Sequence, residues 1–134
     1  MAAYKSRVID NIICDKVSGE LDASLASEWV DKLEEHEAHS KMTLHRFHDV
    51  RDINAVNLSF DNLWSVAQRR LYAYKSGHET LAAFWVSTPL NYGVARMYQS
   101  LTAGTPFKIE VFYNLNEVAD FLGIEQAKLE AVGF

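Results

Sequence analysis

The positions of hydrophobic and polar residues along this chain predict alternating strands and helices. Short apolar runs rich in β-branched residues predict five strands, at residues 4–10, 12–17, within 42–50, at 81–86 and at 107–112. Between the later runs, apolar residues recur every three or four positions, which is the spacing of one helix face. Helices are predicted to begin at Asp22 or Ser24, at Ser59, at Thr88 and at Asn114. The predicted order is therefore β-β-α-β-α-β-α-β-α.

Two of the predicted helix starts carry specific capping signals. Ser59, with Leu58 before it and Leu63 four residues on, has the spacing of a hydrophobic staple. Pro89 fits the first helical position after Thr88, because proline lacks only an amide that would be unpaired there. These signals predict that one helix begins at Ser59 and another at Thr88.

The last predicted helix begins with the spacing of a capping box, at Asn114 and Glu117, and ends before Gly123. The second helix is predicted to end at Gly77. The apolar residues predicted to face inward are Leu25, Trp29, Leu33, Phe60, Leu63, Ala67, Leu71, Tyr74, Leu90, Val94, Met97, Leu101, Leu115, Val118 and Leu122.

The third predicted strand is the least regular of the five. His45, Arg46 and His48 interrupt its apolar pattern, so we expect it to be less buried than the others. Residues 49–57 are predicted to form a polar connection to the second helix.

The fold class follows from the fourth strand and from the element order. Residues 81–86 are continuously apolar, which is typical of a parallel strand covered on both faces. Right-handed crossovers through the helices then give a parallel arrangement, and a tight turn near Asp10 pairs the first two strands antiparallel. We expect an α/β fold with a five-stranded, mostly parallel mixed sheet. One domain should span residues 1–124, and residues 125–134 should form a C-terminal tail with room for one helical turn.

Composition is that of a folded domain. The 134 residues are 49% hydrophobic and 23% charged, and the single cysteine, Cys14, lies in an apolar run and is interpreted as a small buried thiol. A net charge of -5, with basic residues scattered apart from Arg69 and Arg70, disfavours nucleic-acid binding. No apolar run approaches the roughly 18 residues that cross a bilayer, and no signal peptide is recognised. A cytoplasmic location is therefore expected.

Five short sequence segments, in their order along the chain, indicate a resemblance to a known family. They are Val17-Ser-Gly-Glu-Leu21 before the first helix, Phe47-His-Asp-Val50 in a middle strand, Leu58-Ser-Phe-Asp-Asn-Leu63 opening a helix, Asn91-Tyr-Gly-Val-Ala-Arg-Met-Tyr98, and Phe112-Tyr-Asn-Leu-Asn-Glu-Val-Ala-Asp-Phe-Leu122. In this order, over roughly residues 4 to 124, the chain resembles the SpoIIAA-like or STAS-type domains. The strings are most similar to an uncharacterised bacterial branch of that family.

The resemblance implies two kinds of function. In anti-anti-sigma members of the wider family, a phosphorylated serine at a helix start controls docking to a partner kinase. The nearest position here is Ser59, although the family's aspartate before the serine and glycine after it are absent. Other sequences near this branch are labelled as similar to CRAL-TRIO lipid-transfer domains, which implies a binding site for an apolar ligand.

A second candidate site lies where the fourth strand turns into a helix. The free amides and dipole of a helix start favour a bound anion. Arg96 shares a helix face with Tyr92, so it is placed to pair with a carboxylate or phosphate. The residues of this candidate ligand site are Ser87, Thr88, Asn91, Tyr92 and Arg96. The alternative is structural: the threonine caps the helix, the tyrosine packs and the arginine pairs with an acidic neighbour.

Metal and acid–base chemistry have weaker support. His36, His39, His45 and His48 are close in sequence, but zinc needs three or four convergent ligands. The last two histidines are three residues apart and point to opposite faces of a regular strand. Asp49, Asp52 and Asp61 are interpreted as caps and turn formers rather than a catalytic pair, and the three tryptophans as core rather than a cavity lining.

The sequence therefore leaves two main function classes open, with an enzyme as a third and weaker one. The leading hypothesis is a non-catalytic domain that acts through protein contacts, with regulation among its roles and Ser59 at its docking surface. The alternative is a binding domain for a small apolar or anionic ligand at the strand ends. No catalytic motif is visible, no cofactor is expected, and a homo-oligomer is plausible because homodimers are common.

Overall fold

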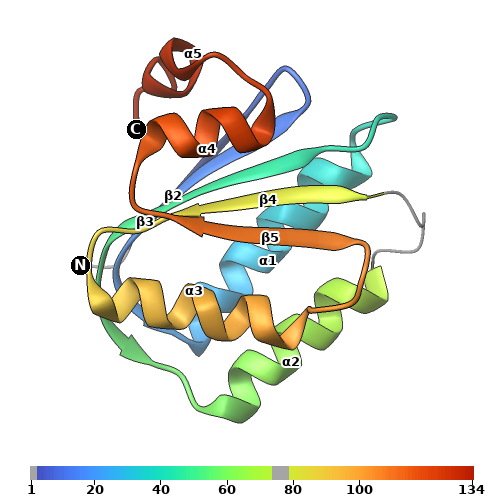
Figure 1. The fold of residues 1–134 in the computed structure, drawn as a ribbon. Coiled ribbons are helices and arrows are strands. Elements are labelled where there is room, and N and C mark those ends of the chain that lie inside the picture. The colour runs from blue at the N-terminus through green and yellow to red at the C-terminus, as the bar shows by residue number, and fades with distance from the viewer. Residues whose placement is uncertain (1–2, 74–78) are drawn as a thin grey trace.

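The computed structural model describes residues 3–73 and 79–134, and its strands form one five-stranded sheet in the order of the chain (Figure 1). The first two strands pair antiparallel and the other pairs are parallel, as predicted. The strands are β1 (Ala3–Ile9), β2 (Ile12–Asp22), β3 (His45–Asn57), β4 (Thr80–Trp85) and β5 (Phe107–Phe112).

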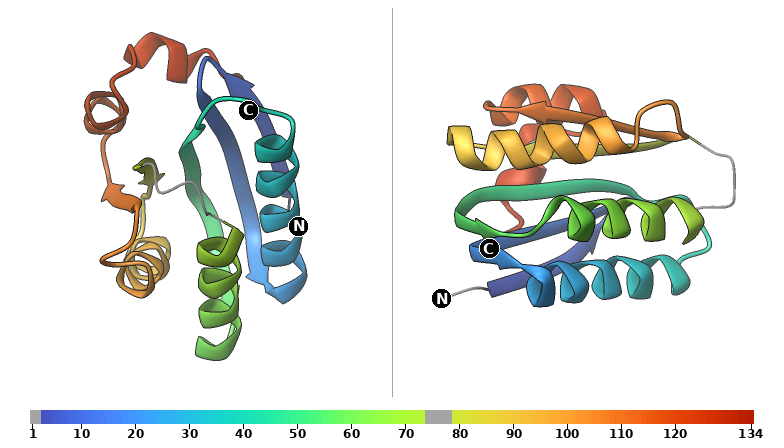
Figure 2. Two further views of the ribbon diagram at one scale, coloured as in Figure 1. Left: turned by 90° about the vertical axis from the view of Figure 1, so that its right-hand side faces the viewer. Right: turned by 90° about the horizontal axis from the view of Figure 1, so that it is seen from below.

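Helices cover both faces of the sheet. They are α1 (Ala23–Ala38), α2 (Phe60–Ala73), α3 (Pro89–Leu101), α4 (Leu115–Leu122) and α5 (Gln126–Glu130). The first three lie side by side against one face, with α2 in the middle, and α4 covers the other (Figure 2). Each face therefore has its own apolar core, one under α1–α3 and one under α4 and α5.

The third strand differs from its prediction. β3 continues to Asn57, so the interpretation of residues 49–57 as a polar connection is wrong. It lies between β2 and β4, and its residues 46–50 are all buried, so the expectation of a less buried strand is also wrong. The physical reason is that its polar side chains have partners inside the molecule. His48, for example, binds the carboxylate of Asp15 on β2.

Capping at the helix starts is largely as predicted. Thr88 accepts a hydrogen bond from the Asn91 amide, and Pro89 is the first residue of α3. Ser59 accepts from the amide of Asn62, and Asn62 Oδ1 accepts from the Ser59 amide in return.

The last long helix departs from its predicted start. At the start of α4, Asn114 donates to the Glu117 carboxylate (3.2 Å) instead of capping a backbone amide. The predicted capping box is therefore wrong. Gly123 ends the helix with a positive φ of 68°, which glycine adopts without strain.

The inward face of α3 is rotated from its prediction. Leu90 and Met97 are 42% and 46% exposed, whereas Asn91 and Ala95 are buried. Phe60 at the start of α2 is also exposed, at 58%. The predicted inward positions of Leu90, Met97 and Phe60 are therefore wrong. Tyr74 and Gly77 lie outside the described residues.

The interpretation of Cys14 as a buried thiol is confirmed, since its exposed fraction is 0%. Burial, followed by the nearby carboxylate of Asp15, raises the pKa of the thiol to about 12. A thiolate is the nucleophilic form, so this cysteine is an unreactive core residue at neutral pH.

Candidate functional site

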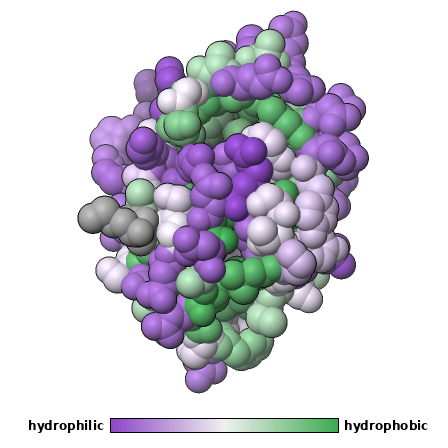
Figure 3. Space-filling view, turned by 90° about the vertical axis from the view of Figure 1, so that its left-hand side faces the viewer, coloured by the Kyte–Doolittle hydropathy of each residue, from purple (hydrophilic) through white to green (hydrophobic). Residues whose placement is uncertain are grey.

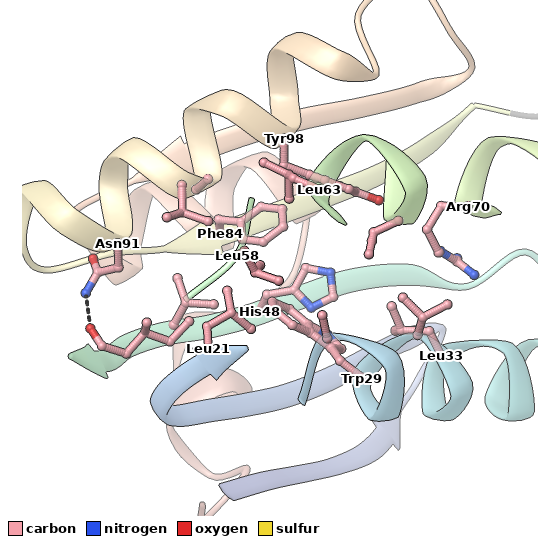
Figure 4. Close-up of a pocket in the computed structure, with 17 residues that line it drawn as sticks. Leu21, Trp29, Leu33, His48, Leu58, Leu63, Arg70, Phe84, Asn91 and Tyr98 are labelled. Atoms are coloured by element: carbon pink, nitrogen blue, oxygen red, sulfur yellow. Dashed lines mark hydrogen bonds between the residues drawn. The ribbon is translucent and has the colours of Figure 1, made fainter. Parts of the chain in front are cut away.

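A cavity of about 70 Å³ lies between helices α1–α3 and the sheet (Figure 4). On a scale of roughly 10–15 Å³ for each water-sized group, it has room for about five to seven such groups. Its lining is mostly aliphatic and aromatic, with a few polar side chains. The residues are Leu21, Ala26, Trp29, Val30, Leu33, His48, Val50, Ile53, Leu58, Leu63, Val66, Arg70, Phe84, Asn91, Val94, Ala95 and Tyr98.

The main polar group in this lining is a histidine held by a buried carboxylate. Strand register places Asp15 of β2 directly beside His48 of β3. The Asp15 carboxylate is 0% exposed and lies 2.7 Å from His48 Nδ1. Because an ionised carboxylate only accepts, the ring donates its Nδ1–H. The other ring nitrogen, Nε2, has no hydrogen-bond partner among the described residues and lies on a ring that lines the cavity.

Two further donors hold the same carboxylate in place. Trp29 Nε1–H and the Tyr4 hydroxyl donate to Asp15 Oδ2 over 3.0 and 3.1 Å. Burial, and then the Asp15 charge, raises the pKa of the Tyr4 hydroxyl, so it stays protonated and can donate. The orientation of His48 is therefore fixed through a network of three hydrogen bonds on the buried carboxylate of Asp15.

Charged side chains from α1, α2 and β3 form a cluster at another side of the cavity. Glu37 of α1 accepts two hydrogen bonds from Arg70 of α2, at 3.0 and 2.7 Å, and also contacts Arg46 of β3. Arg70 and Arg46 are 3% and 4% exposed. Burial lowers the pKa of the Arg70 guanidinium, while Glu34 at 3.9 Å acts in the opposite direction. Two buried guanidinium groups thus share one carboxylate.

The Tyr98 hydroxyl faces this charged side of the cavity. Burial raises the pKa of the Tyr98 hydroxyl, and the charges of Arg70 and Arg46 act in the opposite direction. In Figure 4 the hydroxyl points along α2 toward Arg70, on the opposite side from Asn91. It has no hydrogen-bond partner within residues 3–73 and 79–134, so it is available as a donor.

A surface groove between α1 and α2 adjoins the cavity. The groove has a volume of about 210 Å³ and shares part of its wall with the cavity. The shared residues are Ala26, Val30, Leu58 and Val66. Small side chains, including Ala23, Ser27 and Ser65, line its outer part. The groove therefore borders the cavity on the side of α1 and α2.

Ser87, Thr88 and Asn91 of the predicted ligand site lie close together at the start of α3, but their polar atoms form hydrogen bonds with one another. Asn91 Oδ1 accepts from the amides of Ser87 and Thr88, at 2.9 and 3.1 Å. Its Nδ2 donates to the carbonyls of Arg51 and Ile53 on β3. The amides that would favour an anion already have an acceptor, so the geometry does not favour this site, which stays a prediction.

The other two residues of that predicted site lie apart from its amides. Tyr92 stacks on Tyr113, with ring centroids 5.4 Å apart, and Arg96 is exposed beside the Tyr92 ring. Figure 3 views the side of the molecule where β4 ends and α3 begins, and polar side chains fill its middle between two apolar areas. Of the five predicted residues, only Asn91 lines the cavity.

Ser59, the predicted phosphorylation position, is exposed and caps α2. Phe60 and Trp64, 58% and 46% exposed, lie within the next turn and a half of the same helix. The site stays a prediction, with an exposed apolar surface beside it.

The histidines are distributed over separate environments. His36 Nε2 pairs with the Ser6 hydroxyl, and His39 Nδ1 lies 2.8 Å from a backbone carbonyl of α1. His45 Nδ1 accepts from the Leu81 amide, and burial lowers the pKa of its ring. Within the described ranges, three or more potential ligands do not gather in a way that could hold a metal ion.

The interpretation of the aspartates as caps and turn formers is wrong for two of them, because both belong to β3. Asp49 is buried and binds Arg51 through both carboxylate oxygens, while the Arg51 guanidinium stacks 3.4 Å above the Trp85 ring. Asp52 pairs with Lys16 at 2.9 Å. Asp61 lies in the first turn of α2, where a negative charge is favourable.

The fold defines a class: this is a small α/β domain with a SpoIIAA-like fold. The structure is similar to that of an uncharacterised protein of the DUF3478 family with a SpoIIAA-like fold, from Shewanella loihica. The two share 16% sequence identity and superpose with a TM-score of 0.62, over 91% of this chain and 95% of the other. No protein-family model matches the chain, and no curated protein matches it.

Among the helices formed by residues 3–73 and 79–134, none is both long and apolar enough to cross a bilayer.

Proposed function

We propose that this domain binds a small, mostly apolar molecule in the cavity between α1–α3 and the sheet. The observation that supports this best is His48, a histidine 4% exposed whose Nδ1 is held by Asp15 and whose Nε2 has no partner among the described residues. Nε2 is not among the described buried atoms that lack a partner, so this fixed nitrogen is reachable from the cavity space and is suited to a ligand.

The cavity lining also fits an apolar ligand better than a reactive one. Ligand sites are mostly hydrophobic, with a few placed polar groups, and this lining has that composition. Its 17 described residues include no serine, threonine, cysteine or lysine. The serine, threonine, cysteine and lysine nucleophiles are therefore missing from this described wall, which favours binding over covalent catalysis.

Entry to the cavity is assigned to the groove between α1 and α2. Ion pairs join these helices at one end, where Arg69 binds Asp31 and Glu34, and Arg70 binds Glu37. Away from these pairs, the facing residues are small, as at Ala23 and Ser65. If α1 and α2 separate at the end that lacks these ion pairs, a ligand can enter while the ion pairs stay intact.

Filling the cavity tests the proposed function. Ala95 is buried and lines it, so Ala95→Leu should place its added carbons in free space. We expect the free energy of unfolding to stay within about 1 kcal/mol of wild type. Pentan-1-ol, added to the wild-type protein, should shift the NMR signal of the Trp29 indole N–H, and this shift should be lost in Ala95→Leu.

Ala82 supplies the matched control. It is buried on the same face of the sheet, at 3% exposure, but does not line the cavity. Overpacking there should destabilise Ala82→Leu by about 1–3 kcal/mol. If Ala95→Leu is destabilised as much as Ala82→Leu, or if pentan-1-ol leaves the Trp29 signal of the wild type unchanged, the proposed function is wrong.

A protein-contact function is the second candidate, and exposed apolar side chains favour it. Phe60 and Trp64 stand beside Ser59 on α2, and large exposed apolar residues on one helix face are typical of partner sites. A phosphate on Ser59 would add about two negative charges at a helix start, where the dipole stabilises them, and would change what docks there.

Ser59→Asp tests that second function. Asp is also a good helix cap, so the fold should be preserved while a negative charge is added to the surface. We expect partners captured from the source cell by the wild-type protein to be lost in Ser59→Asp and in Trp64→Ala. Ser100→Asp, on an exposed part of α3, is the control. Identical captured proteins for all four forms would contradict a docking role for the start of α2.

A further inference from the structure

His48 and Tyr98 place their polar atoms on one wall of the cavity. The His48 ring lies 4.7 Å from the Phe84 ring, and the Tyr98 ring lies 6.0 Å from it, measured between ring centroids. All three side chains line the cavity, and Figure 4 shows the Tyr98 side chain above the His48 ring. Within the described residues, neither His48 Nε2 nor the Tyr98 hydroxyl has a hydrogen-bond partner, and neither atom is sealed from the cavity space. A ligand in the cavity can therefore reach both atoms.

The two atoms have opposite hydrogen-bonding roles. Asp15 accepts from His48 Nδ1, so in the neutral ring Nε2 carries a lone pair and only accepts. Burial raises the pKa of the Tyr98 hydroxyl, so this group stays protonated and donates. A hydroxyl group on the ligand meets both requirements, because its proton binds Nε2 while its oxygen accepts from Tyr98. An ether, ketone or carboxylate oxygen meets only the second requirement.

The charges near the cavity favour a neutral head group. On the side of Tyr98, three basic side chains are paired with three acidic ones: Arg46, Arg69 and Arg70 with Asp31, Glu34 and Glu37. On the side of His48, the Asp15 carboxylate already accepts three hydrogen bonds. A charged ligand would therefore enter without an unpaired counter-ion among the described residues, and burying an unpaired charge costs far more than burying a hydroxyl group.

We propose that the cavity selects neutral alcohols with one hydroxyl group and an apolar body, an inference that rests on the proposed function. His48 Nε2 accepts a hydrogen bond from the ligand's hydroxyl group, and the Tyr98 hydroxyl donates to the ligand's oxygen. Aliphatic side chains such as Leu21 and Leu63 enclose the hydrocarbon. The volume of about 70 Å³ limits the ligand to about six non-hydrogen atoms.

The test compares pentan-1-ol with its isomer 1-methoxybutane, whose oxygen accepts a hydrogen bond but has no proton to donate. We expect the wild-type protein to bind pentan-1-ol at least about fivefold more tightly, measured by NMR titration of the Trp29 indole signal. Tyr98→Phe removes the donor that both probes use, so it should weaken both by a similar factor of about three and keep the preference. Tyr92→Phe, on the same helix but outside the cavity lining, should change neither affinity.

The acceptor role of His48 is measured directly in the wild-type protein. In protein labelled with ¹⁵N-histidine, at about pH 8, the Nε2 resonance should have the position of a ring nitrogen without a proton. Pentan-1-ol should move this resonance much more than 1-methoxybutane does. His48→Phe keeps a planar ring but removes the acceptor, so it should bind the two isomers equally. The labelled wild-type protein decides the question if His48→Phe does not fold.

Three results would overturn the alcohol inference and leave an apolar-ligand function in place. They are equal affinities of the wild type for the two isomers, an Nε2 resonance that shows a bound proton, and a preference for the alcohol that persists in folded His48→Phe. Affinities unchanged by Tyr98→Phe would also contradict it, because the hydroxyl would then not bind the ligand's oxygen. If neither isomer moves the Trp29 signal, the proposed function fails as well.

Discussion

Asp15→Ala should lower the free energy of unfolding by about 3–5 kcal/mol, because it leaves one buried and two partly buried donors without an acceptor. The wild-type carboxylate is 0% exposed and binds His48, Trp29 and Tyr4. Urea unfolding followed by tryptophan fluorescence measures the change. The NMR signal of the Trp29 indole should also lose the shift that its bond to a carboxylate produces.

Two other variants test the stabilising role of the Asp15 network even if Asp15→Ala does not fold. Tyr4→Phe removes one of the three donors and should cost about 1–2 kcal/mol. Asp52→Ala removes an exposed partner of Lys16, with a side chain 58% exposed, and should change stability by less than about 1 kcal/mol. A Tyr4→Phe variant as stable as Asp52→Ala would contradict a structural role for the network.

The element order could be predicted from the sequence because its signals are local. The continuous apolar run of β4 and the capping residues of α3 each lie within a few positions of one another. Thr88 and Pro89 form the predicted helix start, and the predicted antiparallel pairing of the first two strands is also confirmed. Local signals of this kind do not depend on which strand lies beside which.

The hydrogen-bonded network around Asp15 could not be predicted, because its partners are far from it in the sequence. Asp15 is a charged residue inside the apolar run of β2, which is a signal of a buried polar group, but the sequence does not identify its partner. Only the register of β2 against β3 places it beside His48, 33 residues away. His48, together with His45 and Arg46, also interrupted the apolar pattern of β3 and led to the wrong prediction for that strand.

The cavity depends on how helices are rotated, which is also a tertiary property. Asn91 donates hydrogen bonds to two carbonyls of β3, and these bonds fix the rotation of α3. Ala95 and Tyr98 therefore face the sheet, whereas Leu90 and Met97 are exposed. Hydrophobicity alone ranks leucine and methionine above asparagine for burial. A fully hydrogen-bonded asparagine overrides that ranking, because each of its buried polar atoms has a partner.

Glu37→Gln should destabilise the protein by about 2–4 kcal/mol, because it leaves two buried guanidinium groups without their shared carboxylate. Arg70 and Arg46 are 3% and 4% exposed, and Glu37 binds Arg70 through both oxygens. The loss should fall short of that for a fully buried pair, because the Glu37 side chain is 26% exposed and Glu34 lies 3.9 Å from Arg70.

The position of Glu37 supports this explanation. It lies in the last turn of α1, where the helix dipole disfavours a negative charge, so its benefit comes from contacts with other elements. Glu35→Gln, two residues earlier, removes an exposed carboxylate paired with Lys32 and should change stability by less than about 0.5 kcal/mol. Thermal unfolding by circular dichroism compares the two variants. Equal midpoints would contradict a stabilising role for the contacts of Glu37 with the two arginines.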